Sequence, residues 1–282
     1  LSSTVLDSNT IIHNLSGGIS FSFIDKFIAS HTLTVTPLKG LDISLGESIV
    51  YDKKLELLYL MPIMFFRLAD HQLSHQLNAA GSNAQMFFGI SSRGNITNTH
   101  LYGTLFIDEI TISGLFDSYK QRNQFGFTLG GSVTDLPIEN LTATIEFTKI
   151  YPFVYRHYIQ TTDYQSSGYL LGHWMGHNSD LIYGSLNYRF IRGLQATVWA
   201  QYIRKGENGN VQQQYIIQPQ PPFLFGLRKN YSYFGAEIKY EYTHELFGKL
   251  QYQRTNSSLQ QDDLSFADKV LNEFYFSIYY GL

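Results

Sequence analysis

A cluster of aromatic and polar residues in the second half of the chain has the chemistry of a sugar-binding site. His173, Trp174, His177 and Asn178 stand close together in the sequence, and Asp180 follows them. An aromatic face packs against the C–H groups of a pyranose ring, while imidazole and amide groups hydrogen-bond to its hydroxyls. We therefore take the first four residues as carbohydrate-binding candidates. The alternative, which the sequence favours, is that the same side chains anchor a folded loop.

A histidine pair nearer the N-terminus has spacing that can bind zinc. His71 and His75 are four residues apart, so they share one face if the segment is helical. Gln72 follows His71 at the position where a metalloprotease carries glutamate, so the pair has no general base. We therefore expect a polar surface helix here, with no metal and no cofactor.

Two pairs of titratable residues could support hydrolysis. They are His157 with Asp163, and the adjacent carboxylates Asp108 and Glu109. The chain has no G-x-S-x-G nucleophile motif. Adjacent residues of a strand point to opposite faces, so Asp108 and Glu109 can act together only if a β-bulge intervenes. We predict that the protein is not an enzyme.

Opposite charges recur at alternate positions in the last third of the chain. Glu237, Lys239 and Glu241 lie on one predicted strand, with Lys249 and Arg189 on its neighbours. Such charges can pair across strands. Inside a barrel they would satisfy one another in the lumen, which is the interpretation we favour. In an open channel the same ladder would select ions.

The elements that position these side chains are predicted to be β-strands. Apolar and polar residues alternate at residues 141–147, 194–202, 234–242 and 273–282. In the first of these segments, Leu141, Ala143 and Ile145 fall on one face, whereas Thr142 and Thr144 fall on the other. One face of each strand could therefore meet lipid and the other a polar interior.

Short connectors and long irregular stretches alternate along the chain. The connectors lie near residues 40, 94, 138, 193 and 247, and the stretches near 52–83, 108–122, 151–180, 205–231 and 256–270. Short periplasmic turns and long extracellular loops are typical of outer-membrane barrels. About eleven strands follow from Thr32 onward, and at least one more is needed for an even number. Residues 19–28, or residues before them, could supply it. We predict an all-β, transmembrane, antiparallel up-and-down β-barrel of about 12–14 strands, or more if an N-terminal part is missing.

The composition agrees with a membrane barrel. Aromatic residues make up 16% of the chain and charged residues only 15%, whereas soluble domains are about a quarter charged. Aromatic girdles at the membrane interfaces account for the excess. A soluble β-sandwich or lipocalin-like barrel is the alternative, but its outward polar face would carry more Lys, Asp and Glu. We expect a bacterial outer-membrane location.

Other functional classes are excluded by composition. The chain has no cysteine, so it has no disulfide, thiolate zinc site or cysteine nucleophile. A net charge of −3 without a long basic run argues against a nucleic-acid partner. The chain begins at Leu1, so we expect one barrel domain over residues 1–282 that lacks its signal peptide and some N-terminal residues.

Several ordered motifs resemble the capsule-assembly Wzi family, especially its Bacteroidota members. They are residues 27–51 followed by 59–62, residues 101–109, residues 172–180 and residues 222–226. The resemblance implies an outer-membrane barrel with a lectin-like role in holding capsular polysaccharide at the cell surface. Because function belongs to sites and not to barrels, the fold is the stronger implication.

Three functional hypotheses follow. The first is a non-enzymatic, Wzi-like barrel that binds capsular polysaccharide or lipopolysaccharide through extracellular loops. The second is a structural subunit of a larger outer-membrane protein complex, and the third is a porin-like channel. All three expect outer-membrane lipid as a partner.

Overall fold

The computed structural model describes residues 2–13, 19–52, 54–70, 82–110, 122–166 and 169–281. Within these residues, twelve antiparallel strands form one sheet. The strands are β1 (Ser2–His13), β2 (Ile19–Leu38), β3 (Leu41–Asp52), β4 (Asn83–Arg93), β5 (Thr99–Glu109), β6 (Gln124–Thr134), β7 (Leu141–Ile150), β10 (Ser179–Ile191), β11 (Leu194–Lys205), β12 (Lys229–Thr243), β13 (Leu246–Gln260) and β14 (Phe266–Tyr280).

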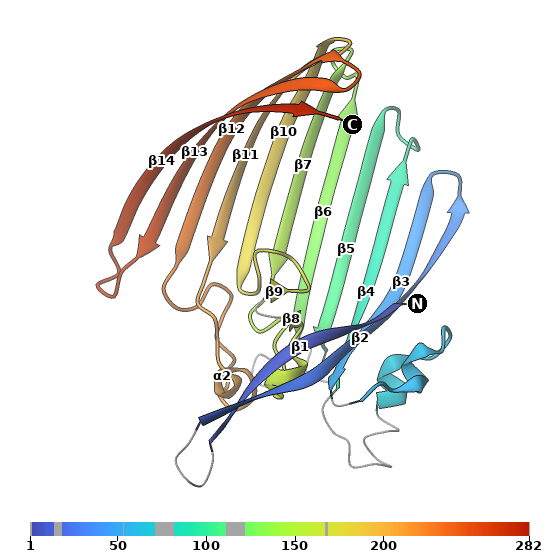
Figure 1. The fold of residues 1–282 in the computed structure, drawn as a ribbon, viewed down its shortest axis with the longest axis vertical. Helices are drawn as coiled ribbons and strands as arrows, with labels where there is room; N and C mark the ends of the chain where they lie inside the picture. Colours follow the sequence, from blue (N-terminus) through green and yellow to red (C-terminus); the bar gives the residue numbers. More distant parts are fainter. Residues whose placement is uncertain are drawn as a thin grey trace.

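Each strand of this sheet pairs with the strands before and after it in the sequence, and the sheet curves into a wall (Figure 1). β1 and β14 are its two edges in the described part of the chain. The predicted fold class and strand number are confirmed. The strand beyond the eleven counted from Thr32 is β1, because residues 19–28 continue directly into β2.

The connections separate into a short-turn end and a loop end, as predicted. Turns near Gly40, residue 95, residue 138 and Gly193 lie at one end, shown at the top of Figure 1. Both glycines have positive φ, 78° and 87°, which a side chain disfavours. The fifth turn is at His244 and Glu245, slightly before the predicted position. The prediction of a long irregular stretch at residues 256–270 is wrong, because β13 and β14 extend through most of these residues.

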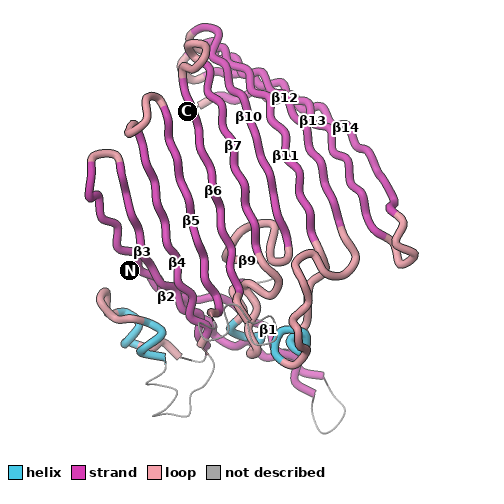
Figure 2. The backbone as a smooth tube through the Cα atoms, turned by 180° about the vertical axis from the view of Figure 1, so that it is seen from behind, coloured by secondary structure: helices cyan, strands magenta, loops and turns pink. Residues whose placement is uncertain are grey.

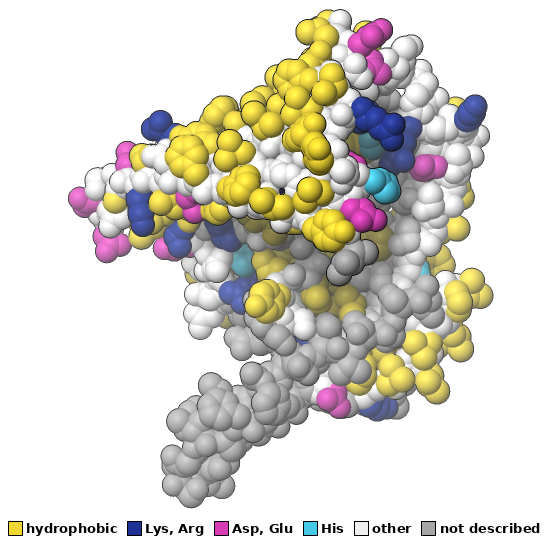
Figure 3. All heavy atoms as spheres, turned by 45° about the horizontal axis from the view of Figure 1, so that its top comes forward, with side chains coloured by type: hydrophobic (Ala, Val, Ile, Leu, Met, Phe, Trp, Pro, Cys, Tyr) yellow, Lys and Arg dark blue, Asp and Glu magenta, His cyan; other side chains and the backbone are white. Residues whose placement is uncertain are grey.

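The predicted alternation of faces is confirmed on the outside of the wall. Ile145 is 66% exposed, and the same face carries Leu186 of β10 and Val198 of β11. The apolar face continues through Phe276 of β14, and Figure 3 shows hydrophobic side chains gathered over that end of the wall. An apolar outer face with a polar inner face is the pattern of outer-membrane barrels.

Helical structure is sparse in the described residues. Two short 3₁₀ helices, η1 (Leu57–Leu60) and η3 (Gln160–Thr162), and the helix α2 (Val211–Tyr215) lie in the loops, and residues 66–70 are also helical. None of the helices in this part of the chain is long and apolar enough to cross a membrane. Figure 2 shows that all of them lie at the loop end, away from the strands' short turns.

The connection between β7 and β10 folds back onto the inner face of the wall. We call its described residues, 151–166 and 169–178, the inner loop; it contains the two-stranded pair β8 (Gln165–Ser166) and β9 (Tyr169–Leu170). Val154, Tyr155 and Met175 of this loop are buried in one cluster with Leu181 and Ile203 of the wall. Figure 1 shows β1 and β2 crossing near the inner loop at the loop end.

Candidate functional site

The inner loop is attached to the wall on both sides of the lumen. It leaves from β7 and returns to β10, and its middle is hydrogen-bonded to strands at the other side of the sheet. The Lys26 ammonium on β2 donates to the carbonyl oxygens of Asp163 and Gln165, at 2.5 and 2.7 Å. The Thr161 hydroxyl donates to the Asp52 carboxylate of β3 at 2.7 Å. The inner loop therefore crosses the lumen near the loop end of the wall.

Asn178, one of the predicted carbohydrate ligands, is buried and fastens loops to one another. Its side-chain oxygen accepts the Leu224 N–H at 2.7 Å, and its amide donates to the carbonyl of Glu207 at 2.9 Å and of Phe225 at 3.3 Å. The alternative interpretation of a loop anchor therefore fits Asn178. With its amide and carbonyl engaged by the backbone, Asn178 does not present a hydrogen-bonding surface to a ligand.

His177 is also buried, with 6% of its surface exposed. Burial, together with the positive charges of Arg156 and Lys205, lowers the pKa of His177 to about 4. Its imidazole is therefore neutral at neutral pH. Like Asn178, it is placed inside the loop region and not on its surface.

His173 and Trp174 are the part of the predicted cluster that a ligand can reach. Trp174 is 62% exposed, and its ring stacks on the ring of His173 at a centroid distance of 5.7 Å. The Tyr155 hydroxyl accepts the His173 N–H at 3.0 Å, and His173 Nδ1 accepts the Met175 N–H at 3.3 Å. The cluster is thus split into a buried anchor and an exposed Trp174 ring that stacks on the part-buried His173.

A polar pocket opens where β5 ends. It has a volume of about 250 Å³, and we call it the mouth pocket. The pairing of β5 with β6 shifts between Ile107 and Glu109, which places a bulge at Asp108. Both adjacent carboxylates, Asp108 and Glu109, therefore line the same pocket. The β-bulge that two adjacent strand residues need in order to act together is present. The pocket is lined by Arg67, Asp70, Ser82, Asn83, Ala84, Asp108, Glu109, Gln124, Arg156, His157, Tyr158 and Tyr215.

The two adjacent carboxyl groups of the mouth pocket are held by hydrogen bonds, and one of them, Glu109, is faced by cations. Asp108 accepts the Tyr155 N–H at 2.7 Å, and Glu109 accepts the Gln124 amide at 3.3 Å. Arg67 and Arg122 interact electrostatically with Glu109. The pocket thus combines carboxyl acceptors with guanidinium donors, a set that suits a polyhydroxylated ligand.

The pair His157 and Asp163 is a structural unit of the inner loop. Asp163 accepts the backbone N–H of His157 at 2.6 Å and pairs with the Arg156 guanidinium at 3.4 Å. The His157 ring nitrogen Nδ1 lies 2.8 Å from the Thr162 hydroxyl. Burial lowers the pKa of His157 to about 4. The imidazole and the carboxylate therefore each serve the loop's own backbone and side chains.

The predicted lumen ladder contains one ion pair among its described members. Lys249 Nζ lies 3.2 Å from Glu237 Oε2. Lys239 stands opposite Lys249 across β12 and β13, and its ammonium lies 4.1 Å from the Phe247 ring instead. Together with Arg192, three ladder residues line a second pocket at the short-turn end: Arg189, Lys239 and Glu241.

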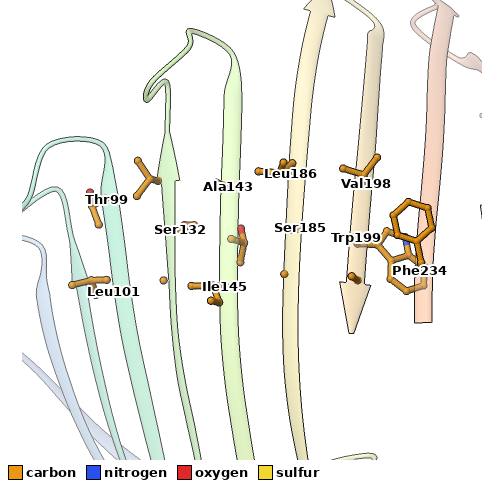
Figure 4. A pocket seen from close by; sticks show the side chains of 15 residues that line it. Thr99, Leu101, Ser132, Ala143, Ile145, Ser185, Leu186, Val198, Trp199 and Phe234 are labelled. Carbon is orange, nitrogen blue, oxygen red and sulfur yellow. The ribbon is translucent and has the colours of Figure 1, made fainter. Parts of the chain in front are cut away.

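The outer face also has a shallow apolar groove, of about 560 Å³ (Figure 4). Small residues of neighbouring strands, such as Gly131, Gly184 and Ala143, form its floor. Leu186 and Phe234 stand beside it. Because it lies on the apolar outer face, this groove belongs to the lipid-facing surface and not to the polar site.

Comparison with known proteins gives weak likenesses to porins. No protein-family model and no curated protein matches the chain. Among solved structures, it is similar to OccD3 (OpdP) of Pseudomonas aeruginosa at 12% identity and a TM-score of 0.43, covering 91% of this chain and 64% of that one. It is also similar to the NanC porin at 8% identity and a TM-score of 0.34, covering 99% of both chains. The resemblance to the Wzi family stays a prediction.

Sequence reasoning missed most of the mouth pocket. Tyr158 and Tyr215 meet there edge to face, with ring centroids 6.1 Å apart, although they come from two different loops. The adjacent carboxylates and His157 were the available signals. In the described part of the chain no group of three or more His, Asp or Glu residues could hold a metal ion. His71 and His75 lie outside the described residues.

Proposed function

We propose that the protein is a non-enzymatic outer-membrane barrel that binds polysaccharide at its loop end, on a platform made by the inner loop. The observation that carries this proposal is the exposed Trp174 ring stacked on His173, next to the anchor residue Asn178. An exposed aromatic ring held in place by its loop can pack on a sugar without a large loss of conformational entropy.

The mouth pocket supports the same function. Its carboxylates, guanidinium groups and tyrosines can accept from and donate to sugar hydroxyls. Its volume of about 250 Å³ lies below the ~300–1,000 Å³ of drug-sized ligand sites. It therefore suits a single sugar residue, with the rest of a polymer lying over the exposed loops.

The experiment is a glycan-array screen of the purified barrel, followed by titration of the best polysaccharide. Trp174→Ala should weaken binding at least tenfold, because the stacking surface is lost. The matched control is Trp199→Phe, which changes a tryptophan packed against Gly235 on the inner face of the wall. Absence of binding across a broad array would refute the proposal, as would equal binding by both variants. The polysaccharide should be recovered uncleaved, since no enzymatic activity is expected.

A channel is the second candidate function. The polar inner face and the basic groups Arg189, Arg192 and Lys239 at the short-turn end favour it. The path of the inner loop across the lumen opposes it, because the loop is fastened to β2 and β3 on the far side. Ionic conductance separates the two candidates.

A further inference from the structure

Part of the connection between β3 and β4 packs on the outside of the wall. We call its described residues 54–70 the outer segment. Tyr59 and Phe66 of this segment are fully buried and form a core with Ile49 and Tyr51 of β3 and Phe27 of β2. Those strand residues share the outward face with Leu33 and Leu45, because the register pairs Phe27 with Tyr51 and Leu33 with Leu45.

The outer segment covers polar groups that would otherwise face lipid. Glu47 and His31 stand opposite each other on the outward face of β3 and β2. The Phe66 N–H donates to the Glu47 carboxylate at 2.7 Å, and the Phe66 ring lies 4.4 Å from the His31 ring. A carboxylate facing hydrocarbon is costly, and this backbone donor with its aromatic cover lowers the cost.

The opposite side of the outer segment is apolar and exposed. Ile63 is 91% exposed, and Leu57, Phe65 and Leu68 are also exposed there. Figure 3 shows hydrophobic side chains gathered at the lower right of the molecule, where this segment lies. At the start of the described segment, Lys54 and Glu56 pair with each other at 3.0 Å. A hydrophobic patch of this kind marks an interaction surface.

The continuity of this patch with the outward face of the strands identifies what covers it. Leu33, 66% exposed, lies on β2 nearer the short-turn end, on the same face as the residues under the outer segment. From Leu33 to Ile63 the apolar surface passes from strand to segment on one side of the molecule. We propose that the outer segment is a membrane-interface anchor, whose exposed apolar side chains lie among the acyl chains of the leaflet at the loop end.

The absence of cysteine allows a direct test. Single-cysteine variants Ile63→Cys and Leu57→Cys are labelled with an environment-sensitive fluorophore and reconstituted in phosphatidylcholine vesicles, with or without brominated acyl chains. Leu33→Cys is the lipid-facing control. Asp262→Cys, in the exposed turn between β13 and β14, is the water-facing control.

Bromine should quench the labels at residues 63 and 57 to within about twofold of the label at residue 33. The label at residue 262 should respond to aqueous iodide and not to bromine. Quenching of the residue 63 and 57 labels by iodide alone would overturn the proposal. So would labels that neither quencher reaches, because protein would then cover the patch. The second variant keeps the test valid if one of the two fails to fold.

Discussion

The Lys26 ammonium donates a hydrogen bond of 2.5 Å to the main-chain oxygen of Asp163, a residue 137 positions away in the sequence. The donor belongs to a strand near one edge of the wall, and the acceptor to the loop that leaves the wall between β7 and β10. This bond and the Thr161–Asp52 bond of 2.7 Å hold the inner loop across the lumen. The function proposed for the loop end depends on this crossing.

Replacing Lys26 with Met should loosen the inner loop. The carbonyl oxygens of Asp163 and Gln165 lose their donor, and each buried unsatisfied group costs about 1–3 kcal/mol. We expect faster amide hydrogen exchange in residues 156–166, with β10 and β11 unchanged. Lys229→Met is the control, since Lys229 is exposed. Equal exchange in the two variants would show that Lys26 does not brace the loop.

Acid should loosen the same region. Burial lowers the pKa of His157 and His177 to about 4, whereas an unperturbed histidine has a pKa of about 6.5. Between these values the unfolded loop binds more protons than the folded one. The histidines' contribution to stability is therefore complete above about pH 6.5 and is lost as the pH falls toward about 4.

Hydrogen exchange at pH 7 and pH 5 measures this effect. The protection of the backbone amides of residues 153–178 against exchange should fall at the lower pH, after correction for the intrinsic exchange rate. His177→Leu should reduce the difference. His244→Leu should leave it unchanged, because the His244 side chain is 99% exposed. If His177→Leu keeps the full pH dependence, as the control His244→Leu should, the assignment of the effect to His177 is contradicted.

Charge on the outer face should cost more than charge on the inner face. Ile145 points outward and is paired with Gly131 and Gly184, whereas the adjacent Thr144 points to the lumen. Lysine at a lipid-facing position near the bilayer centre costs about 2–4 kcal/mol. Ile145→Lys should thus lower the free energy of unfolding from vesicles in urea far more than Thr144→Lys. A larger loss of unfolding free energy for Thr144→Lys would show that Thr144, and not Ile145, faces the lipid.

The strands could be predicted because their information is local. Alternation at residues 141–147 and 194–202 reflects two environments on two faces, and a period of two residues reports it directly. The turn at Gly193 was predictable for the same reason, since glycine relieves the strain of positive φ. These features place the ends of strands such as β10 and β11 to within a few residues.

The site could be predicted only in part because its contacts are long-range. Asn178 and Trp174 are close in the sequence, yet one is buried by Leu224 and Phe225 and the other is exposed. Periodicity carries no information about the path of a loop. The position of the bulge at Asp108 could likewise not be predicted, because it depends on the register of β6 against β5.

The most direct test of the account is ionic conductance in planar lipid bilayers, because the inner loop crosses the lumen near the loop end and should block it. The intact protein should give no steady current above the baseline of the bilayer. A variant with residues 156–176 replaced by a glycine–serine linker, and still resistant to unfolding in detergent, should give a steady current. A stable current of equal size from the intact protein and the variant would contradict the closure and favour the channel.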